Sequence, residues 1–317
     1  MVSDAISCAP HAVFDVKPGE LQPGLTSVVV VTADSGELAV NCVASVLAST
    51  APIELLVVDN ASTDGLIAEL EKRFGGDSRL RIVEQAANIG FGPACNRGAA
   101  LARGDGLLFL NPDCLVQDAT IGRMREVAAG LVNAGVLGVR VLDRNGGVEK
   151  ATRRRDPSLS RALCSLLGLA RFESRWPAMG GISMPPASIR QEAEFVDAVS
   201  GACLFLPRAV FNAVDGFDES YFLHCEDLDL CRRVRDAGFD VMYVSDITVR
   251  HEQGGSSRRR PLFVSRHKHR GMWRYFRRFD PAFGNLLLRA VVWSGIWLHF
   301  LLYAPIHGWR QIRAGKA

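Results

Sequence analysis

The chain has 317 residues, of which 48% are hydrophobic and 22% are charged. Both fractions are typical of globular proteins and exclude a disordered, collagen-like or coiled-coil chain, while a polytopic membrane protein would need several apolar runs of about 20 residues. The net charge of +3 hides an asymmetry, because residues 250–317 carry 14 Lys and Arg but two acids, whereas residues 1–249 carry 23 basic and 32 acidic residues. A basic tail on an acidic body indicates an anionic partner for the tail, such as a phosphorylated ligand, nucleic acid or anionic lipid.

The start of the chain and the cysteines indicate the setting of the protein. Residues 1–25 contain three prolines and no periodic pattern, which predicts a flexible leader, and they contain no evident secretory signal peptide. The eight cysteines include no C-x-x-C pair, and several lie in apolar runs. We therefore expect free, buried thiols in a reducing compartment.

From residue 26 onwards, apolar runs rich in β-branched residues alternate with helical stretches. We expect strands at residues 27–32, 53–58, 80–84 and 106–110 and helices at 37–49, 66–74 and 92–103. This alternation predicts β-α-β units with right-handed connections, and hence an α/β fold with a mainly parallel sheet flanked by helices. Residues 143–193 show no regular pattern. Beyond them we expect order to return at 195–206, with a helix at 226–237 and a strand at 240–244.

Polar residues follow the end of each of these first four strands. They lie in the segments Thr32-Ala-Asp34, Asp59-Asn60, Asn88-Ile-Gly-Phe-Gly92 and Asn111-Pro-Asp113. Ligands of open parallel sheets bind at the carboxyl ends of the strands, so these clusters are expected to converge on one site. Asp113 could hold a divalent cation beside a phosphorylated ligand, and Asp59 could accept hydrogen bonds from a nucleoside. The alternative for both is turn formation, which is favoured for Asp59 taken alone.

The glycine pair Gly90 and Gly92 has the spacing that opens a dinucleotide fingerprint. It follows the third predicted strand rather than the first, however, and Cys95 stands where the fingerprint has its last glycine. This pattern disfavours a nicotinamide oxidoreductase. A loop whose backbone approaches a nucleotide is still consistent with it.

Three acids, Glu226, Asp227 and Asp229, open the predicted helix at 226–237. The helix macrodipole favours acids at this end, but three exceed what capping requires, so one of them could serve as a general base toward a hydroxyl. His251 follows the last predicted strand. A lone histidine is more often structural, but beside a divalent ion it is a reasonable ligand.

In combination and in this order, five segments resemble the family 2 glycosyltransferases, which have the GT-A fold. They are VVDNASTDG (57–65), NIGFGPACNRG (88–98), LNPDC (110–114), the stretch from VSGACLFL to RRVRDAG (199–238) and RHEQGGSS (250–257). The last three segments resemble most the branch that includes bacterial rhamnosyltransferases. The resemblance covers about residues 26–257 and implies a GT-A-type, Rossmann-like sheet.

The resemblance also implies roles for individual residues. Asp227 matches the catalytic base, with Glu226 beside it, and Asp113 matches the last acid of the D-x-D metal motif, which here begins with Asn111. His251 matches a histidine that helps to hold the metal, expected to be Mg²⁺ or Mn²⁺. The implied donor-binding residues are Thr32, Asp34, Asp59, Asn88, Gly92 and Asn96, and the implied acceptor-binding residues are Ser200, Gly201 and Ala202.

This resemblance implies an inverting transfer of a sugar, L-rhamnose being the one it points to, from a dTDP- or UDP-linked donor to a lipid-linked or polysaccharide acceptor of the cell envelope. A single base without a protein nucleophile implies inversion, and a divalent ion would neutralise the charge on the nucleoside diphosphate that leaves. Two rival classes stay open at this point. A nucleic-acid-binding protein would use the basic, aromatic segment 258–279 but leaves the strand-end acids unused. A binder of nucleotide sugars without turnover is disfavoured by the pair Glu226 and Asp227.

Residues 286–306 are the most apolar stretch of the chain and follow a segment dense in basic and aromatic residues. We therefore expect three parts, namely a leader (1–25), a GT-A domain (26–255) and a helical membrane-association region (256–317). A helix over residues 290–306 would extend about 25 Å, whereas the hydrocarbon core of a bilayer measures roughly 30 Å. A helix lying in the cytoplasmic leaflet of the membrane is favoured over a true span, and an ordinary buried helix or a dimer interface is the alternative.

Overall fold

The computed structural model describes residues 20–252 and 260–314, so most of the predicted leader (1–19), residues 253–259 and residues 315–317 lie outside the described residues. The strands are β1 (Gln22–Thr32), β2 (Ile53–Asp59), β3 (Leu80–Glu84), β4 (Gly104–Leu110), β5 (Cys114–Leu115), β6 (Ala134–Asp143), β7 (Arg153–Arg154), β8 (Glu194–Phe195), β9 (Ala198–Val199), β10 (Cys203–Pro207) and β11 (Asp240–His251). The helices are α1 (Gly36–Leu47), α2 (Leu66–Phe74), α3 (Phe91–Leu101), α4 (Thr120–Ala129), α5 (Leu159–Leu166), α6 (Arg208–Ala213), α7 (Glu226–Asp236), α9 (Pro261–Phe279) and α10 (Leu286–Ala314).

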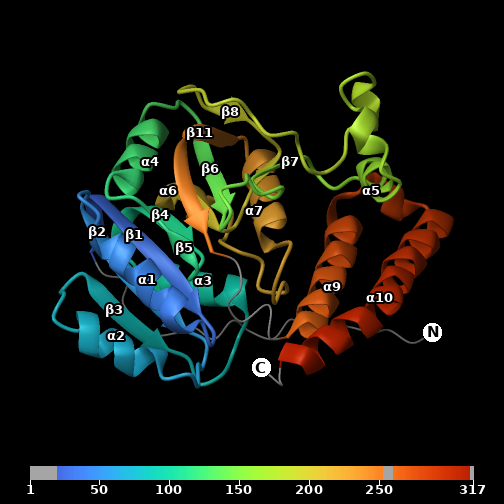
Figure 1. Cartoon of the computed structure of the whole chain (residues 1–317). Helices are drawn as coiled ribbons and strands as arrows, with labels where there is room; N and C mark the ends of the chain where they lie inside the picture. Colours follow the sequence, from blue (N-terminus) through green and yellow to red (C-terminus); the bar gives the residue numbers. More distant parts are fainter. Residues whose placement is uncertain (1–19, 253–259, 315–317) are drawn as a thin grey trace, which may run out of the picture.

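One twisted, mixed sheet forms the centre of the molecule, with the strand order β3-β2-β1-β4-β10-β6-β11-β5 and with β8 beside β11 (Figure 1). The first four strands are parallel, as the sequence predicts. Strand β10 then runs antiparallel to both β4 and β6, so the sheet is mixed rather than wholly parallel. The structure therefore confirms an α/β fold with a Rossmann-like half and helices on both faces.

Alternating side chains of the central strands explain why both faces of the sheet are covered. Val28 and Val30 of β1 point to the layer formed by α1, α2 and α4, whereas Val29 and Val31 point to the layer formed by α3, α6 and α7. A strand whose side chains are apolar on both faces is stable only between two such layers. The continuous valine run of β1 thus accounts for its place in the middle of a three-layer fold.

Two strands are longer than expected, because backbone hydrogen bonds to neighbouring segments extend them. The backbone N–H of Gln22 donates to Arg103 O (2.8 Å), so β1 begins within the predicted leader. Strand β11 does not stop at residue 244 but shifts register between Val244 and Thr248 and continues along β6 to His251. This extension carries His251 to the carboxyl edge of the sheet.

The residues between 143 and 193, which have no regular pattern in the sequence, form a projecting arm that contains α5 and the short 3-10 turns η1 (Leu169–Phe172) and η2 (Pro177–Met179). The arm meets the C-terminal helices where the backbone N–H of Leu159 donates to Asp280 Oδ2 (2.8 Å). The described cysteines are all free and all but Cys164 are buried, as expected from the sequence.

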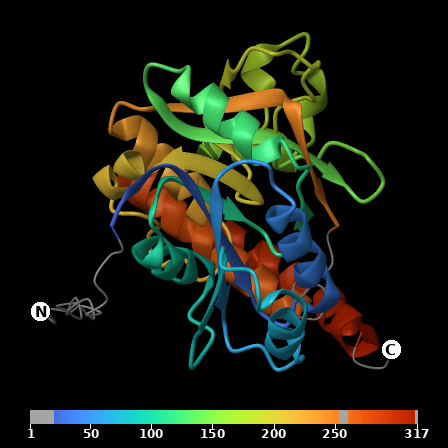
Figure 2. The ribbon, with the colours of Figure 1, turned by 90° about the vertical axis from the view of Figure 1, so that its left-hand side faces the viewer.

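Helices α9 and α10 form an antiparallel pair at one side of the sheet, joined by the turn η3 (Pro281–Gly284) (Figures 1 and 2). His269 Nε2 of α9 lies 3.0 Å from His299 Nδ1 of α10. The inner face of α9 is held to the sheet domain by Arg274, which pairs with Asp218 (2.7 Å), and by Tyr275. By contrast, residues 286–306 of α10 have a mean hydropathy of 1.6 and contribute no buried residue, so by length and composition alone this helix could cross a membrane.

Candidate functional site

A cavity of about 620 Å³ opens at the carboxyl edge of the parallel strands. It is lined by residues that follow β1, β2, β3 and β4, so the polar clusters of the sequence do converge on one site. Among the predicted site residues, Asp34, Asn88, Asp113 and His251 face this cavity. Its far wall consists of residues 222–224, which precede α7, and of Arg260, Phe263 and Val264 at the start of α9.

Thr32 and Asp59 are buried and are not among the residues that line this cavity. Asp59 is 2% exposed, and its carboxylate accepts hydrogen bonds from Thr32 Oγ1 (2.7 Å), Ser62 N (2.9 Å) and Ser62 Oγ. Asp34, with a positive φ of 53°, accepts from the backbone N–H of Thr63 (2.7 Å) and so ties the end of β1 to the same loop. Thr32 and Asp59 therefore shape the loop that forms one side of the cavity.

The segment after β3 divides into two parts with different roles. Asn88 and Gly90 line the cavity, and Gly90 has a φ of 96°. A Cβ at this position would lie 2.7 Å from Phe222 O, so only glycine allows the two loops to approach this closely.

Gly92 and Asn96, two of the expected donor-binding residues, are not among the residues that line this cavity. Asn96 Nδ2 donates to Phe217 O (2.9 Å), and Asn96 Oδ1 accepts from Phe217 N (2.9 Å), while Gly92 packs against the Phe217 side chain. Both residues thus anchor the loop that leads to residues 222–224. Phe91, the first residue of α3, does line the cavity, and Asn96 lies more than one turn further along the same helix.

Asp113 and His251 come together at the cavity edge, although 138 positions separate them in the sequence. His251 Nε2 lies 2.9 Å from Asp113 Oδ1, and Asn111 Nδ2 lies 3.4 Å from the same nitrogen. Cys114 belongs to the same cluster, but burial raises the pKa of its thiol well above the usual value, and the thiol donates to Ala202 O. A carboxylate oxygen suits Mg²⁺ or Mn²⁺, and a neutral imidazole is a common metal ligand, so Asp113 and His251 are the residues that could hold such an ion.

Glu149, a residue that sequence reasoning missed, completes this cluster. Its Oε1 lies 2.7 Å from His251 Nδ1, on the side of the ring away from Asp113. A carboxylate on the second nitrogen orients a metal-binding histidine and strengthens its basicity. Burial lowers the pKa of His251, but the hydrogen bonds that its ring donates to Asp113 and Glu149 outweigh burial and raise the pKa to about 10. No sequence signal marks Glu149, because it lies in the irregular stretch and reaches the site through pairing of its backbone with Val141.

Glu226 and Asp227 begin α7, after two residues with left-handed backbones, His224 (φ 68°) and Cys225 (φ 72°). Such strain in non-glycine residues persists only where the surroundings impose it, and it often accompanies function. Asp227 accepts hydrogen bonds from Arg154 Nη2 (2.6 Å), Gly201 N (3.0 Å) and Leu228 N (2.8 Å). Burial would raise the pKa of Asp227, but the charge and hydrogen bond of Arg154 lower it overall, so the carboxylate is ionised at neutral pH.

Glu226 has the opposite environment. It is 7% exposed, and its Oε2 has no hydrogen-bond partner among the described residues. Burial, followed by the charge of Asp227, raises the pKa of Glu226 well above its usual value. Two neighbouring carboxylates with opposite pKa shifts are typical of a site that moves protons.

Ser200, Gly201 and Ala202 connect the two halves of the site. The backbone N–H of Gly201 donates to Asp227, and Ala202 O accepts from the backbone N–H of Asn111 (2.9 Å). A Cβ on Gly201 would lie 3.1 Å from Asp227 Cβ, so this segment passes directly over the carboxylate. The segment therefore lies between the Asp113–His251 cluster and Asp227.

A Rossmann-like half-sheet with a strand-edge cavity, a carboxylate–histidine cluster and an ionised carboxylate beyond it defines a glycosyltransferase of the GT-A type. Residues 27–189 match the family described as "Glycosyl transferase family 2", and the chain belongs to this family. An N-acetylglucosaminyl-diphospho-decaprenol L-rhamnosyltransferase of Mycobacterium tuberculosis is 29% identical over 266 residues, which cover 77% of this chain and 84% of the relative. A rhamnosyltransferase of Escherichia coli is 30% identical over 142 residues, or 44% and 49% of the two chains.

Solved structures show the same fold at low sequence identity. The mannosyltransferase PcManGT of Pyrobaculum calidifontis, in complex with GDP-Man and Mn²⁺, has a TM-score of 0.55 at 16% identity and covers 96% of this chain and 78% of its own. TarS 1-349 of S. aureus, in complex with UDP, has a TM-score of 0.54 at 17% identity and covers 88% and 71%. The expected GT-A fold is thus confirmed.

Proposed function

We propose that this glycosyltransferase transfers L-rhamnose from a dTDP- or UDP-linked donor to a hydroxyl of a lipid-linked or oligosaccharide acceptor, with inversion at the anomeric carbon. The observation that carries the proposal is the ionised Asp227, which the segment 200–202 links to the Asp113–His251 cluster. The rhamnosyltransferase relative, which aligns with 77% of this chain, supports the choice of sugar and of a diphosphate-linked acceptor.

In the proposed reaction, Asp227 takes the proton of the acceptor hydroxyl while the hydroxyl oxygen attacks the anomeric carbon. The new C–O bond forms on the face opposite the nucleoside diphosphate, whose bond to the anomeric carbon breaks with the electron pair leaving on the diphosphate oxygen. Arg154 holds the Asp227 carboxylate in place through a hydrogen bond, and the backbone N–H of Gly201 donates a second hydrogen bond to the same carboxylate. Asp113 and His251 would hold Mg²⁺ or Mn²⁺, which when bound neutralises charge on the diphosphate.

Protection against thermal unfolding by a panel of nucleotide sugars tests this proposal. With Mn²⁺ present, dTDP-rhamnose is expected to raise the Tm more than GDP-mannose or a nucleoside monophosphate does. Excess EDTA and the variant Asp113→Ala should each remove most of this protection. Equal protection in EDTA would contradict the role of the metal, and a larger shift with another sugar would contradict the choice of rhamnose.

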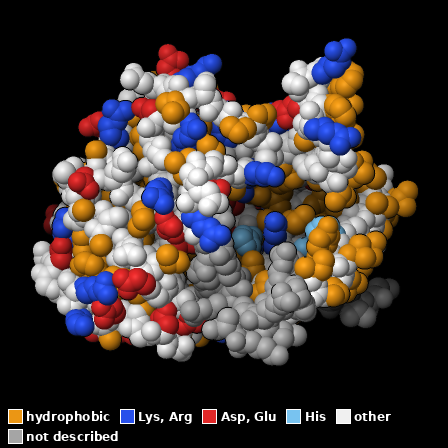
Figure 3. Space-filling view, in the orientation of Figure 1, with side chains coloured by type: hydrophobic (Ala, Val, Ile, Leu, Met, Phe, Trp, Pro, Cys, Tyr) orange, Lys and Arg blue, Asp and Glu red, His pale blue; other side chains and the backbone are white. Residues whose placement is uncertain are grey.

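We also propose that α9 and α10 attach the enzyme to the inner face of the cytoplasmic membrane. The space-filling view shows hydrophobic side chains gathered over the side of the molecule that α10 and the projecting arm occupy (Figure 3). The exposed apolar residues of the arm include Leu166, Leu167 and Trp176. Because α10 lies along α9, which is rich in arginine, a helix pair lying in the membrane interface fits better than a helix crossing the bilayer.

A further inference from the structure

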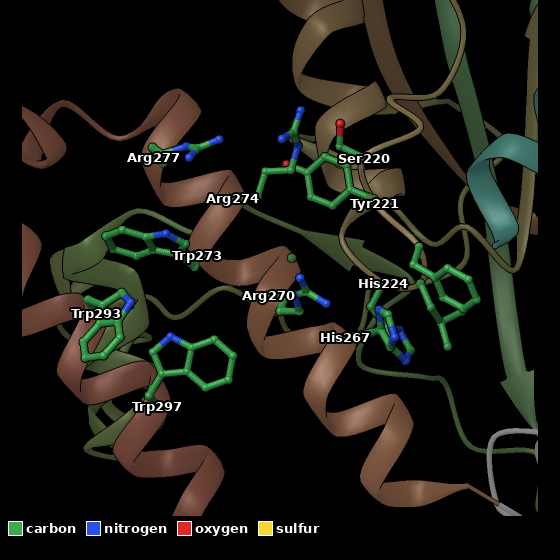
Figure 4. A pocket seen from close by; sticks show the side chains of 13 residues that line it. Ser220, Tyr221, His224, His267, Arg270, Trp273, Arg274, Arg277, Trp293 and Trp297 are labelled. Carbon is green, nitrogen blue, oxygen red and sulfur yellow. The ribbon is translucent and has the colours of Figure 1, made fainter. Parts of the chain in front are cut away.

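A second cavity, of about 500 Å³, lies between the sheet domain and the helix pair, and none of the expected donor-binding or acceptor-binding residues lines it. Its walls come from residues 220–224 of the sheet domain, from α9 and from α10. Figure 4 shows Arg270 between the side chains of Trp273, Trp293 and Trp297 on one side and those of His224 and His267 on the other.

This cavity borders the first cavity, which lies at the carboxyl edge of the parallel strands. Phe222, Leu223 and His224 line both, and only Cys225 separates them from Glu226 and Asp227. Helix α9 approaches this loop so closely that a Cβ on Gly271 would lie 2.8 Å from His224 O. The charge of Asp227 acts on the imidazole of His224, so a ligand that reaches His224 in the second cavity would approach Asp227.

The chemistry of the walls is that of a site for an amphiphile. Three arginines of α9 line the cavity, and Arg274 is held by its ion pair with Asp218. Arg270 and Arg277 are exposed and form no ion pair with any carboxylate of the described residues, so their guanidinium groups are available to an anionic ligand. Guanidinium groups bind phosphate oxygens in a forked, two-bond geometry.

Aromatic residues form the opposite wall. Trp293 and Trp297 belong to α10, whose neighbouring apolar side chains, including Leu298, Leu301 and Leu302, are exposed. Tryptophan at such a boundary combines an apolar ring with a polar N–H group and suits a membrane interface. An apolar chain that leaves the cavity between the tryptophans would run directly onto the exposed face of α10.

We propose that this cavity binds the diphosphate and the first isoprene units of a polyprenyl-diphosphate-linked acceptor. Arg270 and Arg277 contact the diphosphate, the tryptophans contact the isoprenoid chain, and the sugar of the acceptor extends past His224 toward Asp227. The inference rests on the proposed function, because it assigns a place to the lipid-linked acceptor of that reaction. It explains why the basic segment and the apolar helix adjoin the catalytic residues.

Binding of farnesyl diphosphate to the full chain, followed by tryptophan fluorescence, tests the inference. EDTA in the buffer keeps the diphosphate from binding through a metal at the donor site. The double variant Arg270→Gln/Arg277→Gln should weaken binding by at least roughly tenfold, because each lost charge-assisted hydrogen bond contributes substantially. The control Arg266→Gln, an exposed arginine of α9 outside the cavity, should bind as the unmodified chain does.

Related probes identify the ligand class. Farnesol and inorganic pyrophosphate should each bind at least roughly tenfold more weakly than farnesyl diphosphate, since each lacks one of the two recognised parts. Unchanged binding in the double variant would overturn the inference. Equally tight binding of a short-chain phosphatidylglycerol would overturn it too, because the cavity would then serve anionic membrane lipid in general.

Failure of this inference can be distinguished from failure of the proposed function. Protection of the double variant by dTDP-rhamnose and Mn²⁺ reports both folding and the donor site. If the donor protects but farnesyl diphosphate does not bind, the inference fails and the proposed function stands. If farnesyl diphosphate binds through the arginines but no nucleotide sugar protects, the proposed function fails instead. Should the double variant not fold, Arg277→Gln alone decides the question, with an expected loss of about fivefold.

Discussion

At the residue scale, adjacent carboxylates differ because their surroundings differ. Asp227 faces a guanidinium and two backbone N–H groups, which together stabilise its ionised form more than burial disfavours it. Glu226 is buried beside this negative charge and gains no comparable partner, so its protonated form is favoured. Of the two, Asp227 is therefore the carboxylate that is free to take a proton at neutral pH.

Replacing Asp227 by Asn should lower the rate of sugar transfer by about 10²–10⁴-fold, the usual contribution of a general base. Donor affinity should change by less than roughly threefold, because Asp227 is expected to face the acceptor. Single-turnover rates and Tm values from the same preparations test this, with Asp236→Asn at the other end of α7 as the control. A variant that is less stable but turns over normally would show that Asp227 only caps the helix.

Replacing Arg154 by Gln should move the acidic limb of the pH–rate profile to higher pH. Arg154 lowers the pKa of Asp227, and the rate falls as the pH drops through that pKa. Loss of the guanidinium therefore raises the pKa of Asp227 and moves the acidic limb to higher pH. The kcat/KM profile measures this limb in the free enzyme. Arg155→Gln is the matched control, since Arg155 pairs with Glu173 instead. An acidic limb that stays at the same pH in both variants would contradict the effect of Arg154 on the pKa of Asp227.

At the scale of elements, glycines decide how closely helices approach the sheet. On α3, a Cβ at Gly98 would lie 2.5 Å from Val29 Cγ1 and 3.2 Å from Val58 Cγ2. The sequence shows only a glycine within a helical pattern, where alanine is the better helix former by about 1 kcal/mol. Against the sheet, alanine at position 98 is instead expected to be destabilising, because its Cβ would clash with valines that are fixed in the core.

We expect Gly98→Ala to lower the free energy of unfolding by about 1–3 kcal/mol, the cost of overpacking a filled core. Gly122→Ala on α4 is the control, because its Cβ would lie 3.5 Å from Ala51 Cβ, an ordinary contact. That variant should be unchanged or more stable by up to about 1 kcal/mol. Chemical denaturation of both compares them directly, and equal stability of the two would refute the packing argument.

At the scale of the whole molecule, the two C-terminal helices have different partners. Helix α9 contributes Tyr275 and Phe276 to the buried core and pairs with Asp218 through Arg274 and Arg278. Helix α10 rests on α9 and exposes its apolar side chains. The basic and apolar halves of the tail, grouped together in the sequence, thus belong to different layers of the structure.

A chain that ends at Asn285 should therefore lose membrane attachment but keep its protection by nucleotide sugars. A chain that ends near residue 255 should also lose stability, because it exposes the surface that α9 covers. Fractionation of cells and thermal unfolding test both forms against the full chain. Retention of the form ending at Asn285 in the membrane fraction would show that α9 or the projecting arm suffices for attachment.

Local patterns of the sequence determined the parallel half of the fold and the residues at its edge. Alternating runs such as 27–32 and 53–58 predict buried strands because burial on both faces demands continuous apolar residues. The ends of those strands then locate the cavity, as Asp34, Asn88 and Asp113 confirm. The acids at 226–229 also stand out locally, since they exceed what a helix end requires.

Only the tertiary structure decided which groups tune the chemistry, because that depends on contacts between distant segments. Arg154 stands in a run of three arginines, and nothing local shows which of them reaches Asp227, 73 residues away. Glu149 reaches His251 through β-pairing, and the register shift in β11 decides where His251 lies. The contacts of Asn96 depend on packing in the same way, since its partners at residues 217 and 219 lie far from it in the sequence. The second cavity exists only because α9 and α10 fold back onto the loop before α7.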